Sequence, residues 1–165
     1  MAGIDARAVY EAHLRAASRA AFSGDLRGLL ARFAIPSQIA MADRSIVITS
    51  SEELDLALQD YVHRLQAEGI TDEREWCDDA VVVRGMPDLI SGRHTTEWHF
   101  GDGRPPRRFG NRMVLLRHPE GWKLLWLRSD LACDEMELLS AEFVAAQALA
   151  FKPLNSGRRR DGAPS

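Results

Sequence analysis

The chain has 165 residues and carries 24 acidic and 21 basic side chains, which gives a net charge of −3. This length suits one domain with its own apolar core. A content of 45% hydrophobic and 27% charged residues excludes a disordered or low-complexity chain. Charged residues interrupt the first twenty positions and no apolar run reaches the length of a membrane span, so we expect a cytoplasmic protein without membrane contact.

Two helices are predicted at the start of the chain. Asp5 is a suitable N-cap for a helix that carries apolar residues every three or four positions and ends near Gly24. A second, short helix is expected from about Asp25 to Phe33, because Pro36 forbids its continuation and favours an extended chain.

A small hairpin and a third helix are expected next. Residues 38–41 and 45–49 are short apolar stretches on either side of a polar triplet, a pattern typical of two short strands. Ser50-x-x-Glu53 is a capping box, and the apolar spacing that follows it predicts a helix that stops at Gly69.

The hydrophobic period then changes from helical spacing to alternation, which indicates strands. Four strands are predicted, over residues 73–83, 89–100, 109–118 and 122–129. Turn sequences are expected between them at residues 86–88, 101–103 and 119–121. Consecutive strands with short connections predict an antiparallel meander.

The end of the chain divides into an amphipathic segment and a polar one. Residues 134–151 show helical spacing, whereas residues 152–165 hold Pro, Gly, Ser and an Arg triplet with almost nothing apolar. We therefore expect a single domain over residues 1–151, followed by a flexible tail over 152–165. Helices followed by a meander and a terminal helix indicate an α+β class.

Two stretches support a family resemblance. Residues 90–98 read Ile-Ser-Gly-Arg-His-Thr-Thr-Glu-Trp, and residues 120–124 read Glu-Gly-Trp-Lys-Leu. With the order of elements, they resemble the nuclear transport factor 2-like superfamily over roughly residues 5–130. This superfamily includes SnoaL-like polyketide cyclases, ketosteroid isomerase, scytalone dehydratase and the small subunits of ring-hydroxylating dioxygenases. The resemblance implies a cone-shaped fold in which N-terminal helices pack on a curved antiparallel sheet and leave a pocket.

Scytalone dehydratase is the most similar of these in its motifs, since it also carries Gly-x-His on a middle strand and Gly-x-Trp-Lys near the end. The resemblance would turn His94 toward the pocket. However, residues 21–25 read Ala-Phe-Ser-Gly-Asp where the dehydratase pattern has a Tyr-Asp pair, and no second histidine lies between Phe100 and Arg117. The acid pair of the isomerase has no recognisable counterpart either, so neither activity is transferred to this chain.

His94 is the candidate catalytic residue. Alternation along the strand over 89–100 places it on one face with Thr96 and Trp98, and imidazole is the side chain that titrates near neutral pH without help. The competing interpretation is a core histidine that a hydroxyl or carbonyl group satisfies. The predicted pocket-lining residues are Tyr10, Tyr61, Thr96, Trp98, Trp126 and Arg128.

Other chemistries have little support in the sequence. Glu97 and His99 share a face and form half of a metal site, but no third ligand accompanies them, so no metal is expected. Gly101-x-Gly103 lies between strands instead of before a helix, and the chain is slightly acidic, so neither a nucleotide loop nor nucleic-acid binding is expected. No cofactor is expected.

Two functions remain open from sequence alone. The first is a domain that binds a small apolar or aromatic molecule, with cofactor-free acid–base chemistry of the isomerase, dehydratase or cyclase type through His94. The second is a non-catalytic assembly module that resembles a dioxygenase small subunit, whose Arg-rich strand before a Gly-Trp turn is similar to residues 111–122. An open, polar-lined cavity would favour the first and a filled core the second. Both predict a homodimer through the outer face of the sheet.

Overall fold

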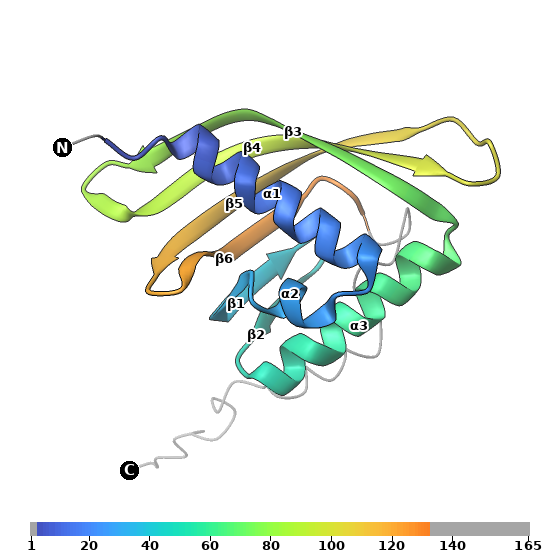
Figure 1. The fold of residues 1–165 in the computed structure, drawn as a ribbon, viewed down its shortest axis with the longest axis horizontal. Coiled ribbons are helices and arrows are strands. Elements are labelled where there is room, and N and C mark those ends of the chain that lie inside the picture. Colours follow the sequence, from blue (N-terminus) through green and yellow to red (C-terminus); the bar gives the residue numbers. More distant parts are fainter. Residues whose placement is uncertain (1–2, 133–165) are drawn as a thin grey trace, which may run out of the picture.

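The computed structural model of the chain describes residues 3–132, which form three helices and six strands (Figure 1). In chain order the elements are α1 (Ala6–Ser23), α2 (Leu26–Leu30), β1 (Phe33–Ala40), β2 (Ser45–Ile48), α3 (Ser51–Ala67), β3 (Ile70–Val83), β4 (Met86–Phe100), β5 (Arg107–His118) and β6 (Gly121–Ser129). The predicted helix over 134–151 and the predicted tail lie outside the described residues.

The predicted boundaries of α1 are confirmed by its caps. The carboxylate of Asp5 accepts a hydrogen bond from the Ala8 N–H at 3.0 Å, and Gly24 ends the helix with a left-handed φ of 74°. The second helix is shorter than predicted, because β1 already begins at Phe33. Phe33 fits the helical spacing in sequence, but it pairs with Leu124 of β6 in the fold.

The capping box of α3 is also confirmed. The Glu53 N–H donates to Ser50 Oγ at 3.2 Å, and Glu53 Oε2 in turn accepts from the Thr49 N–H at 2.7 Å. The small hairpin before it is formed by β1 and β2, which pair antiparallel with Ala40 opposite Ser45. These local signals therefore fix the entry into α3.

The six strands form one sheet in the order β2-β1-β6-β5-β4-β3. The predicted antiparallel meander from β3 to β6 is confirmed, while β1 and β6 pair in parallel and make the sheet mixed. The turn predicted at 86–88 is wrong: β4 starts at Met86, and the turn falls at Gly85, whose φ of 78° a glycine adopts without strain.

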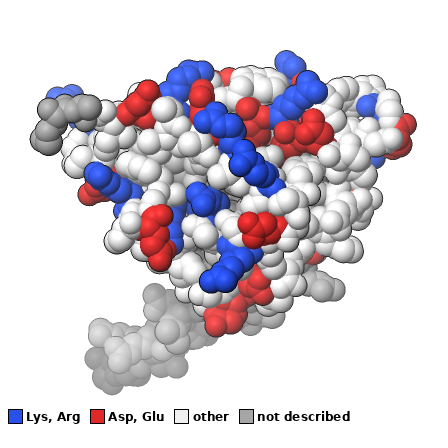
Figure 2. All heavy atoms as spheres, in the orientation of Figure 1, with Lys and Arg blue, Asp and Glu red and all other residues white. Residues whose placement is uncertain are grey.

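The helices lie on one side of the curved sheet (Figure 1). α1 crosses β3 to β6, and α3 follows the end of the sheet near β1 and β2. On the face seen in Figure 2, Lys and Arg side chains lie beside Asp and Glu side chains, so this face has mixed charge. Within residues 3–132, no helix is long and apolar enough to cross a membrane.

Two apolar clusters pack between the helices and the sheet. One joins α3 to β2 and Trp98, and the other joins α1 to the middle strands around Ile90 and Leu115. The space between these clusters is not completely filled by side chains, and this gap is where the candidate site lies.

Candidate functional site

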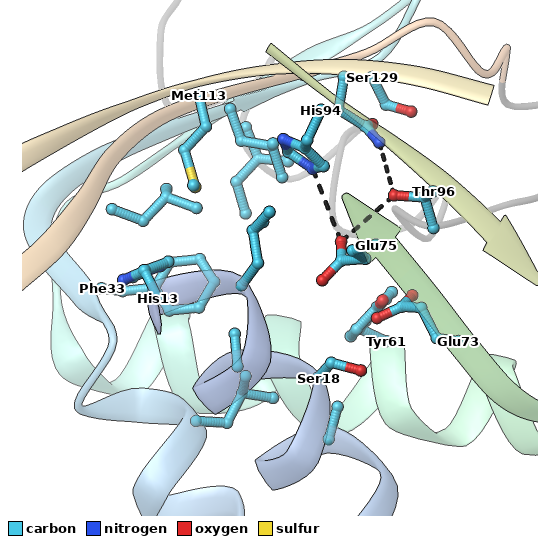
Figure 3. Close-up of a pocket in the computed structure, with 18 of the residues that line it drawn as sticks. His13, Ser18, Phe33, Tyr61, Glu73, Glu75, His94, Thr96, Met113 and Ser129 are labelled. Atoms are coloured by element: carbon cyan, nitrogen blue, oxygen red, sulfur yellow. Dashed lines mark hydrogen bonds and ion pairs between the residues drawn. The ribbon is translucent and has the colours of Figure 1, made fainter. Parts of the chain in front are cut away.

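A cavity of about 150 Å³ separates α1 and α3 from the inner face of the sheet. Its wall is mainly apolar, with polar groups from α1, β3, β4 and β5 (Figure 3). The lining residues are His13, Leu14, Ala17, Ser18, Ala21, Leu29, Phe33, Ile39, Ala57, Leu58, Tyr61, Glu73, Glu75, His94, Thr96, Trp98, Phe109, Asn111, Met113, Leu124, Leu127 and Ser129.

The register between β3 and β4 brings the polar groups together. Glu73 pairs with Trp98, and Glu75 pairs with Thr96, so both carboxyl groups stand on the inner face beside the inward residues of β4. The alternation predicted for β4 is observed, since His94, Thr96 and Trp98 are all buried. The site is therefore built on two long paired strands.

The two inner glutamates are held in an environment that disfavours their charge. Burial and the nearby Glu73 carboxyl raise the pKa of Glu75 well above its usual value. Burial also raises the pKa of Glu73, although Glu73 Oε2 accepts a hydrogen bond from Trp98 Nε1 at 2.8 Å and its carboxyl accepts a further one from Ser18. Two neighbouring carboxyl groups in an apolar wall favour their protonated forms, because each disfavours a negative charge on the other.

A hydrogen-bond chain and a histidine contact converge on one oxygen atom of Glu75. In the first, Asn111 Nδ2 donates to Thr96 Oγ1 at 2.8 Å, and the Thr96 hydroxyl donates to Glu75 Oε1 at 3.2 Å. In the second, Tyr10 hydrogen-bonds His94 Nδ1 at 2.7 Å, and His94 Nε2 lies 3.6 Å from the same Oε1. Among the described residues, no hydrogen bond engages Glu75 Oε2, and Figure 3 shows this second oxygen pointing into the cavity.

The protonation state of His94 follows from its surroundings. Burial raises the pKa of Tyr10 far above its usual value, so its hydroxyl keeps its proton and donates to Nδ1. Burial lowers the pKa of His94 to about 4, so the imidazole is neutral at neutral pH and carries its proton on Nε2, toward Glu75. The sequence analysis expects this imidazole to titrate near neutral pH. In the fold its pKa lies well below that range, because the ring is buried.

The residues predicted from sequence occupy three places. Tyr61, Thr96, Trp98 and His94 line the cavity. Tyr10 is fully buried behind His94 and holds its ring, without lining the cavity itself.

Trp126 and Arg128 lie apart from this cavity, in an open hollow beside β1 and β2. The cause is an irregularity in β6: Val114 pairs with Trp126, but Leu115 pairs with Leu124, so one extra residue shifts the alternation. As a result, Leu124 faces the cavity while Trp126 and Arg128 do not.

Glu97 and His99, the two residues that share a face of β4 as half of a metal site, contact each other and Arg108. Glu97 Oε1 lies 2.8 Å from His99 Nε2, and Glu97 Oε2 accepts from Arg108 Nε at 3.0 Å. Across residues 3–132, no group of three or more His, Cys, Asp and Glu side chains is arranged to hold a metal ion.

Sequence reasoning missed Glu73, Glu75 and His13 as cavity residues. The available signal was that Glu73 and Glu75 are two apart on a predicted strand that pairs with the strand of His94, so both share one face. His13 falls on the apolar spacing of the first predicted helix, and the sequence pattern gives no separate indication of its role.

Comparison with known proteins shows the fold. No protein-family model matches the sequence, and no curated protein matches it. Among solved structures, a domain of unknown function with a cystatin-like fold from Nostoc punctiforme superposes with a TM-score of 0.62 at 16% identity, over 90% of this chain and 94% of that one.

Two further structures carry more specific descriptions. An NTF2-like protein of unknown function from Shewanella oneidensis gives a TM-score of 0.59 at 8% identity, over 74% of this chain and 96% of that one. A ketosteroid isomerase-like protein from Erwinia carotovora atroseptica gives 0.52 at 17% identity, over 75% of this chain and 94% of that one. The chain therefore has the nuclear transport factor 2-like, or cystatin-like, α+β fold. At these identities the likeness shows the fold alone, so the chemistry rests on this chain's own residues.

Proposed function

We propose that the chain binds a small, largely apolar or aromatic molecule in the cavity and catalyses a cofactor-free proton transfer on it, of the type that isomerases, dehydratases and cyclases use. Glu75 takes and returns the proton, while His94 and Thr96 hold its carboxyl group. The observation that carries this proposal is the buried Glu75 carboxyl, whose Oε1 accepts a hydrogen bond from Thr96 and lies 3.6 Å from His94 Nε2, while Oε2 faces the cavity.

The chemistry follows from the environment of the carboxyl group. A carboxylate in apolar surroundings is a stronger base than one in water, which is what the raised pKa of Glu75 expresses. It can remove a proton from a carbon atom next to an electron-withdrawing group. The protonated carboxyl then returns the proton to another carbon in an isomerisation, or to a departing oxygen in a dehydration.

A substrate-independent test uses 5-nitrobenzisoxazole, a small aromatic molecule that any suitably placed base opens. The base removes the proton from the ring carbon, the N–O bond breaks, and the coloured nitrophenolate product is followed by absorbance. We expect Glu75→Gln to lower the protein-dependent rate by about 100-fold, the usual contribution of a positioned general base. The rate of the unmodified protein should rise with pH through the raised pKa of Glu75, since only the carboxylate is a base.

The matched control is Glu97→Gln, which makes the same chemical change on the opposite face of the sheet. Its rate should equal that of the unmodified protein. Equal rates for Glu75→Gln and the unmodified protein would contradict the proposed role of Glu75. If the unmodified protein neither binds the probe nor accelerates its opening, the proposed function fails as a whole.

A further inference from the structure

Asn111 is a polar residue of the cavity wall to which the proposed function gives no role. It lies on β5 directly opposite His94 of β4, and it is only 7% exposed. Its amide nitrogen Nδ2 donates to Thr96 Oγ1 at 2.8 Å, and the described residues show no hydrogen bond from Asn111 to Glu75. Asn111 therefore reaches the carboxyl group of Glu75 through Thr96.

The bond from Asn111 sets the direction of the Thr96 hydroxyl group. An amide N–H only donates, so Thr96 Oγ1 is the acceptor in this bond and its own proton is available for another group. The acceptor within reach is Glu75 Oε1 at 3.2 Å, as the dashed line between Thr96 and Glu75 in Figure 3 shows. Since Thr96 is only 2% exposed, bulk water does not replace this acceptor. Asn111 thus keeps Thr96 as a donor to Oε1.

A second N–H group faces the same oxygen atom. Tyr10 donates to His94 Nδ1, so the proton of the neutral ring is on Nε2, which lies 3.6 Å from Glu75 Oε1. A proton placed on Oε1 would therefore meet two groups that already direct protons toward it. Oε2 has no hydrogen-bond partner among the described residues and points into the cavity (Figure 3). When the carboxyl group of Glu75 is protonated, its proton is thus on Oε2, where a ligand can reach it.

We propose that Asn111 is a positioning residue for the proton transfer: it orients the Thr96 hydroxyl so that Oε1 of Glu75 stays an acceptor and Oε2 carries the exchangeable proton. This inference rests on the proposed function, because it takes Glu75 as the group that exchanges a proton with the ligand. It adds a residue that controls which oxygen atom performs the exchange. Without Asn111, Thr96 Oγ1 lacks its donor, and a proton on Oε1, away from the ligand, can supply one.

The titratable groups around Glu75 are the same with or without Asn111. They come from α1, α3, β3 and β4, and the cavity wall contains no Lys or Arg. These groups are Tyr10, His13, Tyr61, Glu73 and His94. Replacing Asn111 by leucine changes no charge among them, so the replacement acts on the hydrogen bond to Thr96.

A double-mutant cycle with Asn111→Leu and Thr96→Val tests the proposal. The first readout is the rate of opening of 5-nitrobenzisoxazole as a function of pH. The second is the ¹³C resonance of the Glu75 carboxyl carbon, assigned as the signal that is absent from Glu75→Gln.

In Asn111→Leu we expect the pKa of Glu75 to rise, because the protonated carboxyl gains a bond to Thr96 and the carboxylate loses one. The rate at a pH below this pKa should fall about tenfold, the effect of one net hydrogen bond. Asn111→Ala removes the same donor without adding bulk and should act in the same direction.

The decisive comparison is the same change in the Thr96→Val background. Because Asn111 acts through the Thr96 hydroxyl, Asn111→Leu should change the rate there by less than about twofold and should not move the pKa further. A general loosening of the wall would have equal effects in both backgrounds. Thr95→Val makes the same chemical change on the outer face, where Thr95 donates to Asp78 Oδ2, and should leave the rate and the Glu75 pKa as in the unmodified protein.

The outcomes separate this inference from the proposed function. Suppose that Glu75→Gln lowers the rate, but Asn111→Leu leaves the rate and the Glu75 pKa unchanged or alters them equally in both backgrounds. The positioning role is then overturned and the proposed function stands. If the rate does not depend on Glu75, the proposed function fails and this inference falls with it.

Discussion

Two glutamate–histidine pairs stand on opposite faces of the same sheet. On the inner face, Glu75 Oε1 lies 3.6 Å from His94 Nε2, and on the outer face Glu97 Oε1 lies 2.8 Å from His99 Nε2. Both glutamate side chains are 14% exposed. Their pKa values nevertheless move in opposite directions: that of Glu75 is raised and that of Glu97 is lowered.

The difference comes from depth and from the neighbouring charges. Glu97 is covered by a thin layer of side chains, and the Arg108 guanidinium that bonds it stabilises its carboxylate. Glu75 lies in the protein interior, where the neighbouring carboxyl of Glu73 adds to the effect of burial on its pKa. An equal exposed fraction therefore does not mean an equal environment. The same two residue types make a paired surface contact on one face and part of a buried cavity wall on the other.

The largest effect on stability is expected from removing the inner histidine. The folded pKa of His94 is about 4, below the 6.5 of an unfolded histidine, so acid favours unfolding between these two pH values. Because of this lowered pKa, acidification from pH 7 to pH 4 reduces the free energy of unfolding by about 3 kcal/mol. We expect His94→Asn to lose less stability than the unmodified protein over that interval, by about this amount, in urea unfolding at each pH.

His99→Asn on the outer face is the matched control. Because it keeps His94 in place, its loss of stability on acidification should remain close to that of the unmodified protein. Identical acid profiles for His94→Asn and the unmodified protein would mean that the inner face is as well solvated as the outer one, and the comparison between the pairs would fail.

A smaller loss of stability is expected from adding a methyl group at Gly92, next to the Tyr10 ring that holds His94. A Cβ atom on Gly92 would lie 2.6 Å from Cε2 of Tyr10, the residue whose hydroxyl holds the imidazole. Gly92→Ala should cost about 1–3 kcal/mol of unfolding free energy, as overpacking does. At Gly110 a Cβ would lie 2.6 Å from Asp130 Oδ2, the end of a flexible side chain that can move away. Gly110→Ala should therefore be tolerated, and equal losses for both variants in thermal unfolding would contradict this account.

The sequence was sufficient to predict the elements that local rules control. The cap at Asp5, the capping box at Ser50 and the inward face of β4 are all observed, because hydrogen bonds near in sequence and strict alternation determine them. Their order, together with the stretches 90–98 and 120–124, carried the resemblance to the nuclear transport factor 2-like superfamily, and the solved structures confirm that fold.

The inner carboxyls could not be found by the same rules. Trp76 follows Glu75 directly and therefore points to the opposite face from Glu73 and Glu75, so the rule that places aromatic residues in the core would turn the acids outward. In the fold Trp76 is 38% exposed and lies against the guanidinium of Arg108, while Trp98 and Thr96 supply the hydrogen bonds that bring the acids inside. Trp98, Thr96 and Arg108 belong to other strands, so the pattern of β3 alone does not reveal them. The extra residue in β6 that turns Trp126 away from the cavity is likewise not visible in the pattern of one strand.

The smallest effect on stability is expected from Glu97→Gln on the outer face. The sign of its pH dependence tests the comparison between the two faces. The lowered pKa of Glu97 means that its contribution to stability is present above about pH 4.5, the pKa of an unfolded glutamate, and is lost as the pH falls through the lower folded value. Glu97→Gln should therefore be slightly less stable than the unmodified protein at neutral pH and should match it in acid. The raised pKa of Glu75 has the reverse consequence, since the unmodified protein loses stability as the pH rises above about 4.5. Glu75→Gln should gain stability relative to the unmodified protein over that range, and urea unfolding of both variants from pH 3 to 9 would show whether the two slopes have opposite signs, as two faces with opposite electrostatics require.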